Sequence, residues 1–293
     1  MTRIVVLGDV MVDVVARLSG PLAAASDAPA TIRFHGGGSA ANAAAWLRAA
    51  GAEPVLVGCV GDDERGRHAR EELRLGGVDL RLAVDPELPT GTCVVLVGPD
   101  GERTMVPDAG ANDALREGDL ADELLSAGGH LHAAGYALLR AGSRAAARGA
   151  IRRASRVGMS VSVDPSSSAL LSADFLDWAA GAGLLLPNAA EAEALTGLAD
   201  PERAARALAE RFPEVVVTLG GAGALWTNGS EVLRAPAEPV EAVTDSTGAG
   251  DAFAAGLLNA RLSGASIGEA LAAGCRLAAR AVTQAGARPN CGH

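Results

Sequence analysis

The heptapeptide Asp245-Ser246-Thr247-Gly248-Ala249-Gly250-Asp251 lies near the end of the chain, between an extended-looking segment, 240–244, and an apolar run, 252–262. The apolar run is rich in small residues and contains no proline, which is typical of a helix. A glycine-rich turn that opens a helix favours an anion, because unpaired backbone N–H groups and the positive end of the helix dipole lie there. Asp251 adds a carboxylate in the first turn. An anion site beside a base is what phosphoryl transfer to a hydroxyl requires, although an ordinary helix start fits the same residues.

The charged residues limit the classes of function. The chain has 25 basic and 35 acidic residues, a formal net charge of −10, so we expect no nucleic-acid partner and no membrane association. Every basic residue is arginine, so the chain lacks the lysine of a P-loop, of a protein kinase and of a Schiff base. Any phosphate must therefore be bound by backbone amides, helix ends or arginines.

Composition also predicts the kind of core and the compartment. Of the 293 residues, 49% are hydrophobic and only 3% aromatic, which predicts a large aliphatic core. The four cysteines, at positions 59, 93, 275 and 291, stand alone, so we expect no disulfide framework and a cytoplasmic location. Because Asp9 and Asp13 interrupt the apolar stretch 1–18, we expect neither a signal peptide nor a membrane span there.

Short apolar runs alternate with helical segments along most of the chain. The pattern predicts buried strands at 4–7, 54–60, 130–134, 159–163 and 215–218, and helices that include 63–75, 117–127, 143–157, 173–180 and 250–262. Such alternation implies a mostly parallel sheet with helices on both faces, with ligands beyond the carboxyl ends of the strands. Residues 92–97 and 103–106 flank Pro99-Asp100-Gly101 and predict a hairpin that has room to form a separate small sheet.

Three further candidate sites follow predicted strands. Asp13, with the glycines at 36–38 and Asn42, offers a carboxylate, an amide and close backbone approach, which suit sugar hydroxyls. The segment 187–191 follows a strand and opens a helix, where Asn188 and Glu191 also fit a plain capping box. The segment 218–224, a strand end and a glycine turn, fits either a nucleotide phosphate or a tight connection.

Two other patterns suggest different chemistry. His130 and His132 share a strand face, as metal ligands do, but no third ligand is near in the sequence, so we expect buried or edge histidines. Gly36-x-Gly38-x-x-Ala41 is a degenerate dinucleotide fingerprint and would suit an NAD-dependent oxidoreductase, but it follows a loop and a short strand rather than opening a βαβ unit.

Taken together and in this order, the segments resemble the ribokinase-like (PfkB) family of carbohydrate kinases over about residues 3–288. The heptapeptide matches the family signature D-[ST]-T-G-A-G-D at every position, 37–42 its glycine motif, 188–191 its N-x-x-E motif and 218–220 its nucleotide strand. The resemblance implies one ribokinase-like three-layer α/β sandwich over residues 1–293, with a mostly parallel central sheet. A small β-sheet lid is expected from the segments 10–17, 31–36 and 91–107.

The resemblance also implies a role for each matching residue in an ATP-dependent sugar kinase. Asp251 would take the proton from the attacking hydroxyl, and the N–H groups of Gly248, Ala249 and Gly250 would form an anion hole for the γ-phosphate. The sugar would be held by Asp13, Gly37, Gly38, Asn42 and Arg103.

The nucleotide and metal residues follow from the same resemblance. ATP would be bound by Asn188, Glu191, Thr218, Gly220 and Gly223, and Glu191 would bind Mg²⁺ through water. Asp245 and Thr247 would hold a potassium ion. The lid would close over the sugar and, as in many relatives, form a homodimer.

The acceptor stays open among three classes at this point. Ser39 stands where several family members carry lysine, and Met11 where ribokinase has a polar residue, so the sugar is not fixed. A pentose or hexose is expected first. A 2-keto-3-deoxy sugar acid is second. Arg33 and Arg103 of the lid segments can meet its carboxylate, or the phosphate of a sugar phosphate, although solvated surface arginines fit the same pattern. A nucleoside is third, because the lid segments offer only Phe34 to stack on a base. A non-catalytic sensor is disfavoured by the intact Asp251.

Overall fold

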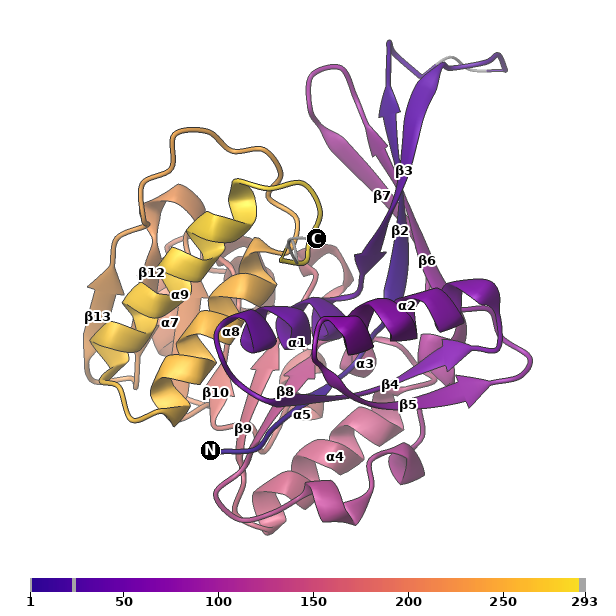
Figure 1. Ribbon diagram of the computed structural model, residues 1–293. Coiled ribbons are helices and arrows are strands. Elements are labelled where there is room, and N and C mark those ends of the chain that lie inside the picture. Colours follow the sequence, from indigo (N-terminus) through magenta and orange to yellow (C-terminus); the bar gives the residue numbers. More distant parts are fainter. Residues whose placement is uncertain (1, 23–24, 290–293) are drawn as a thin grey trace.

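A nine-stranded sheet forms the centre of the molecule in the computed structural model, which describes residues 2–22 and 25–289. Its strands lie in the order β13-β12-β11-β10-β9-β8-β1-β4-β5 (Figure 1). Seven strands run parallel: β1 (Ile4–Leu7), β4 (Pro54–Gly61), β5 (Asp79–Asp85), β8 (His130–Ala134), β9 (Ser160–Asp164), β10 (Leu184–Leu185) and β11 (Glu214–Thr218). At one edge β12 (Ala224–Thr227) runs antiparallel to both β11 and β13 (Val232–Ala235).

Helices cover both faces of this sheet. One face carries α1 (Ser39–Ala49), α2 (Glu64–Leu75), α8 (Ala249–Leu262) and α9 (Ile267–Val282). The other carries α3 (Tyr136–Leu139), α4 (Arg144–Arg156), α5 (Phe175–Trp178), α6 (Ala189–Thr196) and α7 (Pro201–Leu208). The predicted three-layer α/β sandwich is confirmed. None of the helices in the described ranges is long and apolar enough to span a membrane.

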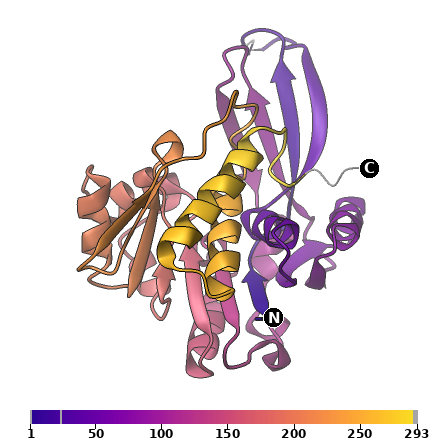
Figure 2. The same cartoon turned by 60° about the vertical axis from the view of Figure 1, so that its left-hand side comes forward.

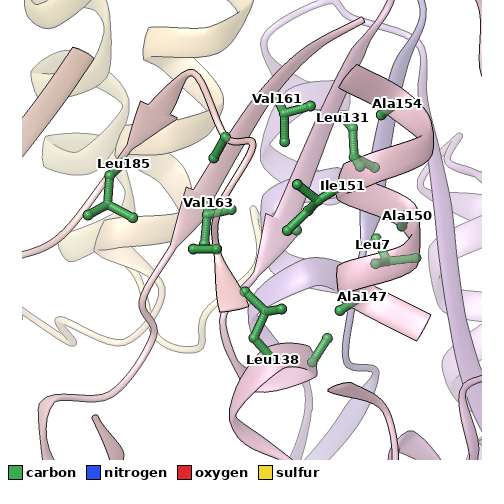
Figure 3. Packing of buried hydrophobic residues seen from close by; sticks show 14 of the residues in the cluster. Leu7, Leu131, Leu138, Ala147, Ala150, Ile151, Ala154, Val161, Val163 and Leu185 are labelled. Atoms are coloured by element: carbon green, nitrogen blue, oxygen red, sulfur yellow. The ribbon is translucent and has the colours of Figure 1, made fainter. Parts of the chain in front are cut away.

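The core between the sheet and α4 shows why the sequence folds into layers. On α4, Ala147, Ala150, Ile151 and Ala154 recur at helical spacing and are buried against the sheet (Figure 3). The strands supply Leu131, Val161 and Val163 to the same cluster. Alanine on the helix and branched residues on the strands let the two layers approach closely, so the core is aliphatic, as the composition predicts.

A small sheet of four strands stands apart from the large one, in the order β3-β2-β6-β7. Its strands are β2 (Met11–Leu18), β3 (Ala30–Gly37), β6 (Gly91–Val97) and β7 (Arg103–Asp108). β6 and β7 form the predicted hairpin, and in Figures 1 and 2 the sheet projects beyond the end of the large sheet. The separate small sheet is as expected, and its movement as a lid stays a prediction.

Two predicted helices were wrong in extent. Residues 117–127 form only two 3₁₀ turns, η2 (Glu117–Asp119) and η3 (Asp122–Leu124). The side chain of Asp119 accepts a hydrogen bond from the Arg116 amide at 2.7 Å, so a local side-chain bond replaces a continuing helix. Residues 173–180 form only the single turn of α5. Three further 3₁₀ turns connect the elements: η1 (Gly110–Ala114), η4 (Ser168–Leu170) and η5 (Gly220–Ala222).

Candidate active site

Asp251 lies in the first turn of α8 and is held by two side chains of α1. The Ser39 hydroxyl donates to Oδ1 at 2.7 Å, and the Asn42 amide donates to Oδ2 at 3.0 Å. The alanine-rich faces of α1 and α8 bring these residues together, although they are more than 200 positions apart in the sequence. The predicted base and one predicted sugar-binding residue, Asn42, are therefore in direct contact.

The carboxyl group of Asp251 is unusually basic. Its pKa is raised to about 8, mainly by burial and also by the nearby carboxylates of Asp164 and Asp9, while the hydrogen bonds from Ser39 and Asn42 lower it. Without ligands the group therefore holds a proton at neutral pH. A group whose pKa lies near the working pH is suited to exchanging a proton with a hydroxyl.

The first amides of α8 open onto free space. Gly248 has a φ of 77°, and a Cβ there would lie 2.4 Å from the Ala287 carbonyl oxygen, so only glycine fits. The amide of Ala249 donates to the Ser246 carbonyl oxygen at 3.3 Å. Those of Gly250 and Asp251 have no hydrogen-bond partner among the described residues. These orphan donors form a ready site for an anion.

A cleft of about 380 Å³, here the central cleft, lies where these residues meet the small sheet. Its lining includes residues at the carboxyl ends of successive parallel strands: Asp9 after β1, Tyr136 after β8, Asp164 on β9, Asn188 after β10 and Thr218 on β11. Met11, Asp13, Cys93, Met105 and Pro107 line it from the small sheet. Strand ends are where the sequence analysis expected ligands to bind.

Asp13 and the glycines form one wall of the central cleft. A Cβ on Gly37 would lie 2.4 Å from Oδ1 of Asp13, so the glycine lets the carboxylate pack against the backbone. Burial raises the pKa of Asp13 to about 6, opposed by the positive charge of Arg288. Arg288 is itself buried and donates to the Gly37 carbonyl oxygen at 2.7 Å. Asp13, Gly38 and Asn42 all line the cleft, as their predicted roles require.

At the N-terminus of α1, the first backbone amides are already hydrogen-bonded to a side chain of the protein. The carboxylate of Asp9 accepts hydrogen bonds from the amides of Ser39 and Ala40, both at 3.3 Å. An anion is thus already seated where the degenerate dinucleotide fingerprint would place a pyrophosphate. Gly36 and Gly37 belong to β3 of the small sheet, not to the opening turn of a βαβ unit. The geometry gives no support to the oxidoreductase alternative.

Asn188 and Glu191 begin α6 with a complete capping box. The Asn188 side chain accepts from the Glu191 amide, and the Glu191 carboxylate accepts from the Asn188 amide, each at 2.9 Å. Burial raises the pKa of Glu191 to about 8, and the charge of Asp164 adds to the shift. Both residues line the central cleft, so the cap and a functional role are compatible.

A second hollow of about 300 Å³, here the apolar cleft, adjoins the first. Thr218, Gly220 and Gly223 line it, together with Val240 and mostly apolar side chains of α8 and α9. The two clefts share Thr218, Ser246, Gly250 and Phe253, and so they meet at the start of α8. The residues expected at the nucleotide thus surround a hollow that can take a flat apolar group.

The predicted potassium ligands are bound by an arginine of the small sheet. The Arg103 guanidinium contacts the Asp245 carboxylate and the hydroxyls of Ser246 and Thr247. Asp245 also accepts from the amides of Thr247 and Gly286. Arg103, expected at the sugar, is not among the described residues that line the central cleft, and Arg33 is exposed on β3. Neither arginine is placed to meet an anionic group in that cleft.

The sequence analysis missed several residues of the central cleft. Asp9 and Asp164 end strands, so the strand-end rule alone was sufficient to find them. Tyr136 and Arg140 follow β8, but nothing in the local pattern distinguishes them from ordinary helix residues. Arg288 lies near the end of the chain, and only the fold brings it to Asp13 and Gly37.

His130 and His132 are buried, as expected, and hydrogen-bond to serines of β9. Burial lowers the pKa of His130 to about 3 and that of His132 to about 4, so both are neutral. Within the ranges 2–22 and 25–289 no three His, Cys, Asp or Glu side chains cluster as a metal site. Cys59, Cys93 and Cys275 are free thiols, and Cys291 lies outside the described residues.

Known proteins share this fold and sequence pattern. The family model described as pfkB family carbohydrate kinase matches residues 1–291. An ATP-dependent ribose-1-phosphate kinase of Halopiger xanaduensis is 33% identical over 276 residues, covering 92% of this chain and 88% of the relative. The crystal structure of adenosine kinase from Sinorhizobium meliloti superposes with a TM-score of 0.89 at 28% identity, covering 99% of this chain and 96% of that one.

A structure of a fructokinase double mutant from Vibrio cholerae, with fructose, ADP and potassium ion bound, is also similar. It has a TM-score of 0.83 at 28% identity, covering 98% of this chain and 94% of that one. The family match extends over almost the whole sequence and includes both clefts. The chain belongs to the PfkB family of carbohydrate kinases.

Proposed function

We propose that this protein is an ATP-dependent sugar kinase that transfers the γ-phosphate to a hydroxyl of a small sugar, a pentose or hexose. One observation carries the proposal: a buried carboxylate, Asp251, sits beside unpaired backbone amides at the point where a polar and an apolar cleft meet. The acceptor would occupy the central cleft and the adenosine part of ATP the apolar cleft. The reacting groups would then meet at Gly250.

Asp251 would act as the base. The acceptor hydroxyl would hydrogen-bond to the carboxylate, which takes its proton as the oxygen attacks the γ-phosphorus. The orphan N–H groups at the start of α8 would donate to the phosphoryl oxygens, whose charge develops in the transition state. Gly250 suits this task. A Cβ there would meet no protein atom within 4 Å, so protein packing does not require glycine at this position, and the free space is available to a ligand.

Asn188 and Glu191 would orient the phosphates and water-bound Mg²⁺. When bound, Mg²⁺ neutralises charge on the phosphate oxygens, and carboxylate and amide oxygens are ligands that it or its waters prefer. The residues fit this group, because Glu191 is buried with a raised pKa that a neighbouring cation would lower. Thr218, Gly220 and Gly223 would line the path of the nucleotide.

We also propose that Asp245 and Thr247 can hold a potassium ion, in competition with Arg103. The guanidinium contacts the Asp245 carboxylate and the Thr247 hydroxyl that the ion would need. We therefore expect weak stimulation of the wild type by KCl and stronger stimulation of Arg103→Ala, with tetramethylammonium chloride as the control salt. Equal stimulation of both proteins would contradict the competition.

The small sheet is proposed to act as a lid and as a dimer surface. Its inner face contributes Asp13 and Pro107 to the central cleft, so closure would exclude water from the phosphate. On the outer face Phe34, Val94 and Val106 lie in register across the strands through Val14 and are exposed. A second copy would cover this apolar row. The three buried free thiols support the cytoplasm as the compartment.

An acceptor screen tests the function. ATP consumption and product mass would be measured with sugars, 2-keto-3-deoxy sugar acids, sugar phosphates and nucleosides, each with and without K⁺. A phosphorylated sugar supports the proposal. If only nucleosides are phosphorylated, the acceptor is a nucleoside and not a sugar. Phe34, the aromatic expected to stack on a base, lies on the outer face, which argues against that outcome. No phosphorylated product from any class would overturn the proposal.

A further inference from the structure

Arg140 is a cation without a counter-ion in the wall of the central cleft. It follows α3 directly, and its guanidinium lies 5.5 Å from the centre of the Tyr136 ring. Its Nη1 atom is buried and has no hydrogen-bond partner. No carboxylate in the described part of the chain forms an ion pair with it. A buried guanidinium nitrogen without a partner is costly. The residue as a whole is only partly buried and lines the central cleft, so an anion in the cleft can act as the missing counter-ion.

The charges around the central cleft are strongly segregated. Asp9, Asp13, Asp164, Glu191 and Asp251 all line it. Arg140 is the one cationic side chain among the described residues of its lining. Among the charged side chains of this lining, Arg140 is therefore the one that attracts an anionic part of a ligand.

The position of Arg140 assigns it to the acceptor and not to ATP. It follows β8, whereas the proposed nucleotide residue Thr218 ends β11, three strands farther along the sheet. Neighbouring strands lie about 4.8 Å apart, so these strand ends are separated by roughly 14 Å. Arg140 is also absent from the described lining of the apolar cleft. The proposed nucleotide residues on β11 and the guanidinium thus lie at different places along the sheet.

We propose that the sugar acceptor carries an anionic group, a phosphate or a carboxylate, which binds to the guanidinium of Arg140. This inference rests on the proposed kinase function and narrows its substrate class. A guanidinium presents paired N–H donors that match two oxygens of a phosphate or carboxylate. Arg140 is accordingly a specificity residue, and it takes no part in the proton transfer at Asp251.

The test compares Arg140→Gln with Arg148→Gln, which removes an exposed arginine of α4 outside both clefts. Steady-state kinetics at saturating MgATP would use D-ribose, ribose 1-phosphate, ribose 5-phosphate and 2-dehydro-3-deoxygluconate. We expect the wild type to prefer an anionic acceptor. A charged hydrogen bond lost from ground and transition states alike should raise the KM for that acceptor about 10- to 100-fold in Arg140→Gln and leave kcat nearly unchanged.

The neutral acceptor and protein stability provide the internal controls. Activity with D-ribose, which has no anionic group, should fall much less in Arg140→Gln than activity with the anionic acceptor, and Arg148→Gln should match the wild type with every acceptor. Because Arg140→Gln removes an unpaired buried group, its melting temperature should not fall. Comparing the KM values for the two ribose phosphates with the KM for 2-dehydro-3-deoxygluconate then shows whether the anionic group is a phosphate or a carboxylate.

Each remaining outcome decides between the two claims. A wild type that prefers D-ribose, or an Arg140→Gln variant that loses neutral and anionic acceptors equally, overturns the inference and leaves the kinase proposal standing. If no acceptor is phosphorylated, the kinase proposal fails. Melting curves with ribose 5-phosphate and with 2-dehydro-3-deoxygluconate then test the anion site alone: stabilisation of the wild type but not of Arg140→Gln supports it, and no stabilisation overturns it.

Discussion

The N-termini of α1 and α8 have similar sequences, but the first backbone amides are hydrogen-bonded to a side chain at α1, whereas no side chain of the described residues caps them at α8. Each helix follows a glycine with positive φ, Gly38 at 94° and Gly248 at 77°, and continues in alanine-rich sequence. At α1 the carboxylate of Asp9 accepts from the first amides, so that helix start is sealed by the protein itself. At α8 the amides of Gly250 and Asp251 find no partner among the described residues and face the junction of two clefts.

The difference teaches that a glycine-rich helix start becomes an anion site only where the fold leaves it open. Both helix dipoles favour negative charge at these ends. At α1 the strand β1 ends directly at the helix start and delivers Asp9 to it. At α8 the preceding residues 236–248 form no strand, and the carboxylate of Asp245 contacts Arg103 instead of the first amides of the helix. The sealed terminus therefore stabilises the fold, and the open one serves chemistry.

The largest effect is expected from Asp251→Asn, which keeps the shape of the open site and removes its base. General-base catalysis contributes about 10²–10⁴-fold, so we expect kcat to fall at least about 10²-fold. The binding of ATP, measured by calorimetry, should remain within a few-fold of the wild type. Glu269→Gln, which alters a first-turn carboxylate of α9, is the matched control and should retain activity. Wild-type turnover by Asp251→Asn would remove Asp251 from the reaction.

Gly250→Ala should separate stability from catalysis. A Cβ at this position meets no protein atom, and alanine favours the helix, so the free energy of unfolding should rise by about 0.5–1 kcal/mol. The same methyl group enters the space of the phosphate, and a misplacement of about 1 Å can cost 10²-fold, so we expect kcat to fall about 10- to 100-fold. Denaturant melts and steady-state rates measure the two effects. A variant that is more stable and fully active would show that no ligand approaches Gly250.

Asp9→Ala should destabilise the protein, because it removes the carboxylate that accepts hydrogen bonds from the first amides of α1. The loss of a capping carboxylate at a helix N-terminus costs about 1–2 kcal/mol, and we expect the free energy of unfolding to fall by this amount. Urea denaturation of the wild type and the variant provides the comparison. Unchanged stability would mean that Asp9 does not hold the helix start, and the contrast between the two termini would fail.

The pH dependence should show the smallest effect. Because the raised pKa of Asp251 is about 8, kcat/KM should rise with pH as the free enzyme loses this proton and should level off above pH 8. Ser39→Ala removes a hydrogen bond that favours the ionised carboxylate, so the rising limb should move to higher pH. Asp9→Ala removes a repelling charge and should move it to lower pH. Shifts in the same direction for both variants would contradict this electrostatic origin.

Much of the fold could be predicted from the sequence, because each local signal agreed with the global one. Val215–Val217 has the continuous apolar pattern of a strand buried on both faces, and α4 has a clear helical period. The region 117–127 was wrong because side-chain hydrogen bonds to the backbone, invisible in periodicity, outweighed helix propensity.

The candidate site was predictable only where one short motif carries it. The start of α8 follows from the heptapeptide alone, and the capping box of Asn188 and Glu191 from its spacing. The contacts of Asp251 with Ser39, of Arg103 with Asp245 and of Arg288 with Gly37 join residues more than 140 positions apart. No local rule specifies such pairs, since they depend on how α1 and the small sheet are placed against α8.

The most direct test of the central claim is a crystal structure with Mg²⁺, ADP, aluminium fluoride and an accepted acceptor. We predict that the fluoride group lies at the start of α8, with its ligands within about 3 Å of the amide nitrogens of Gly250 and Asp251, and that the acceptor hydroxyl contacts the Asp251 carboxylate. The start of α1 should remain closed by Asp9. A fluoride group at any other place, with the amides of α8 still unpaired, would contradict the account.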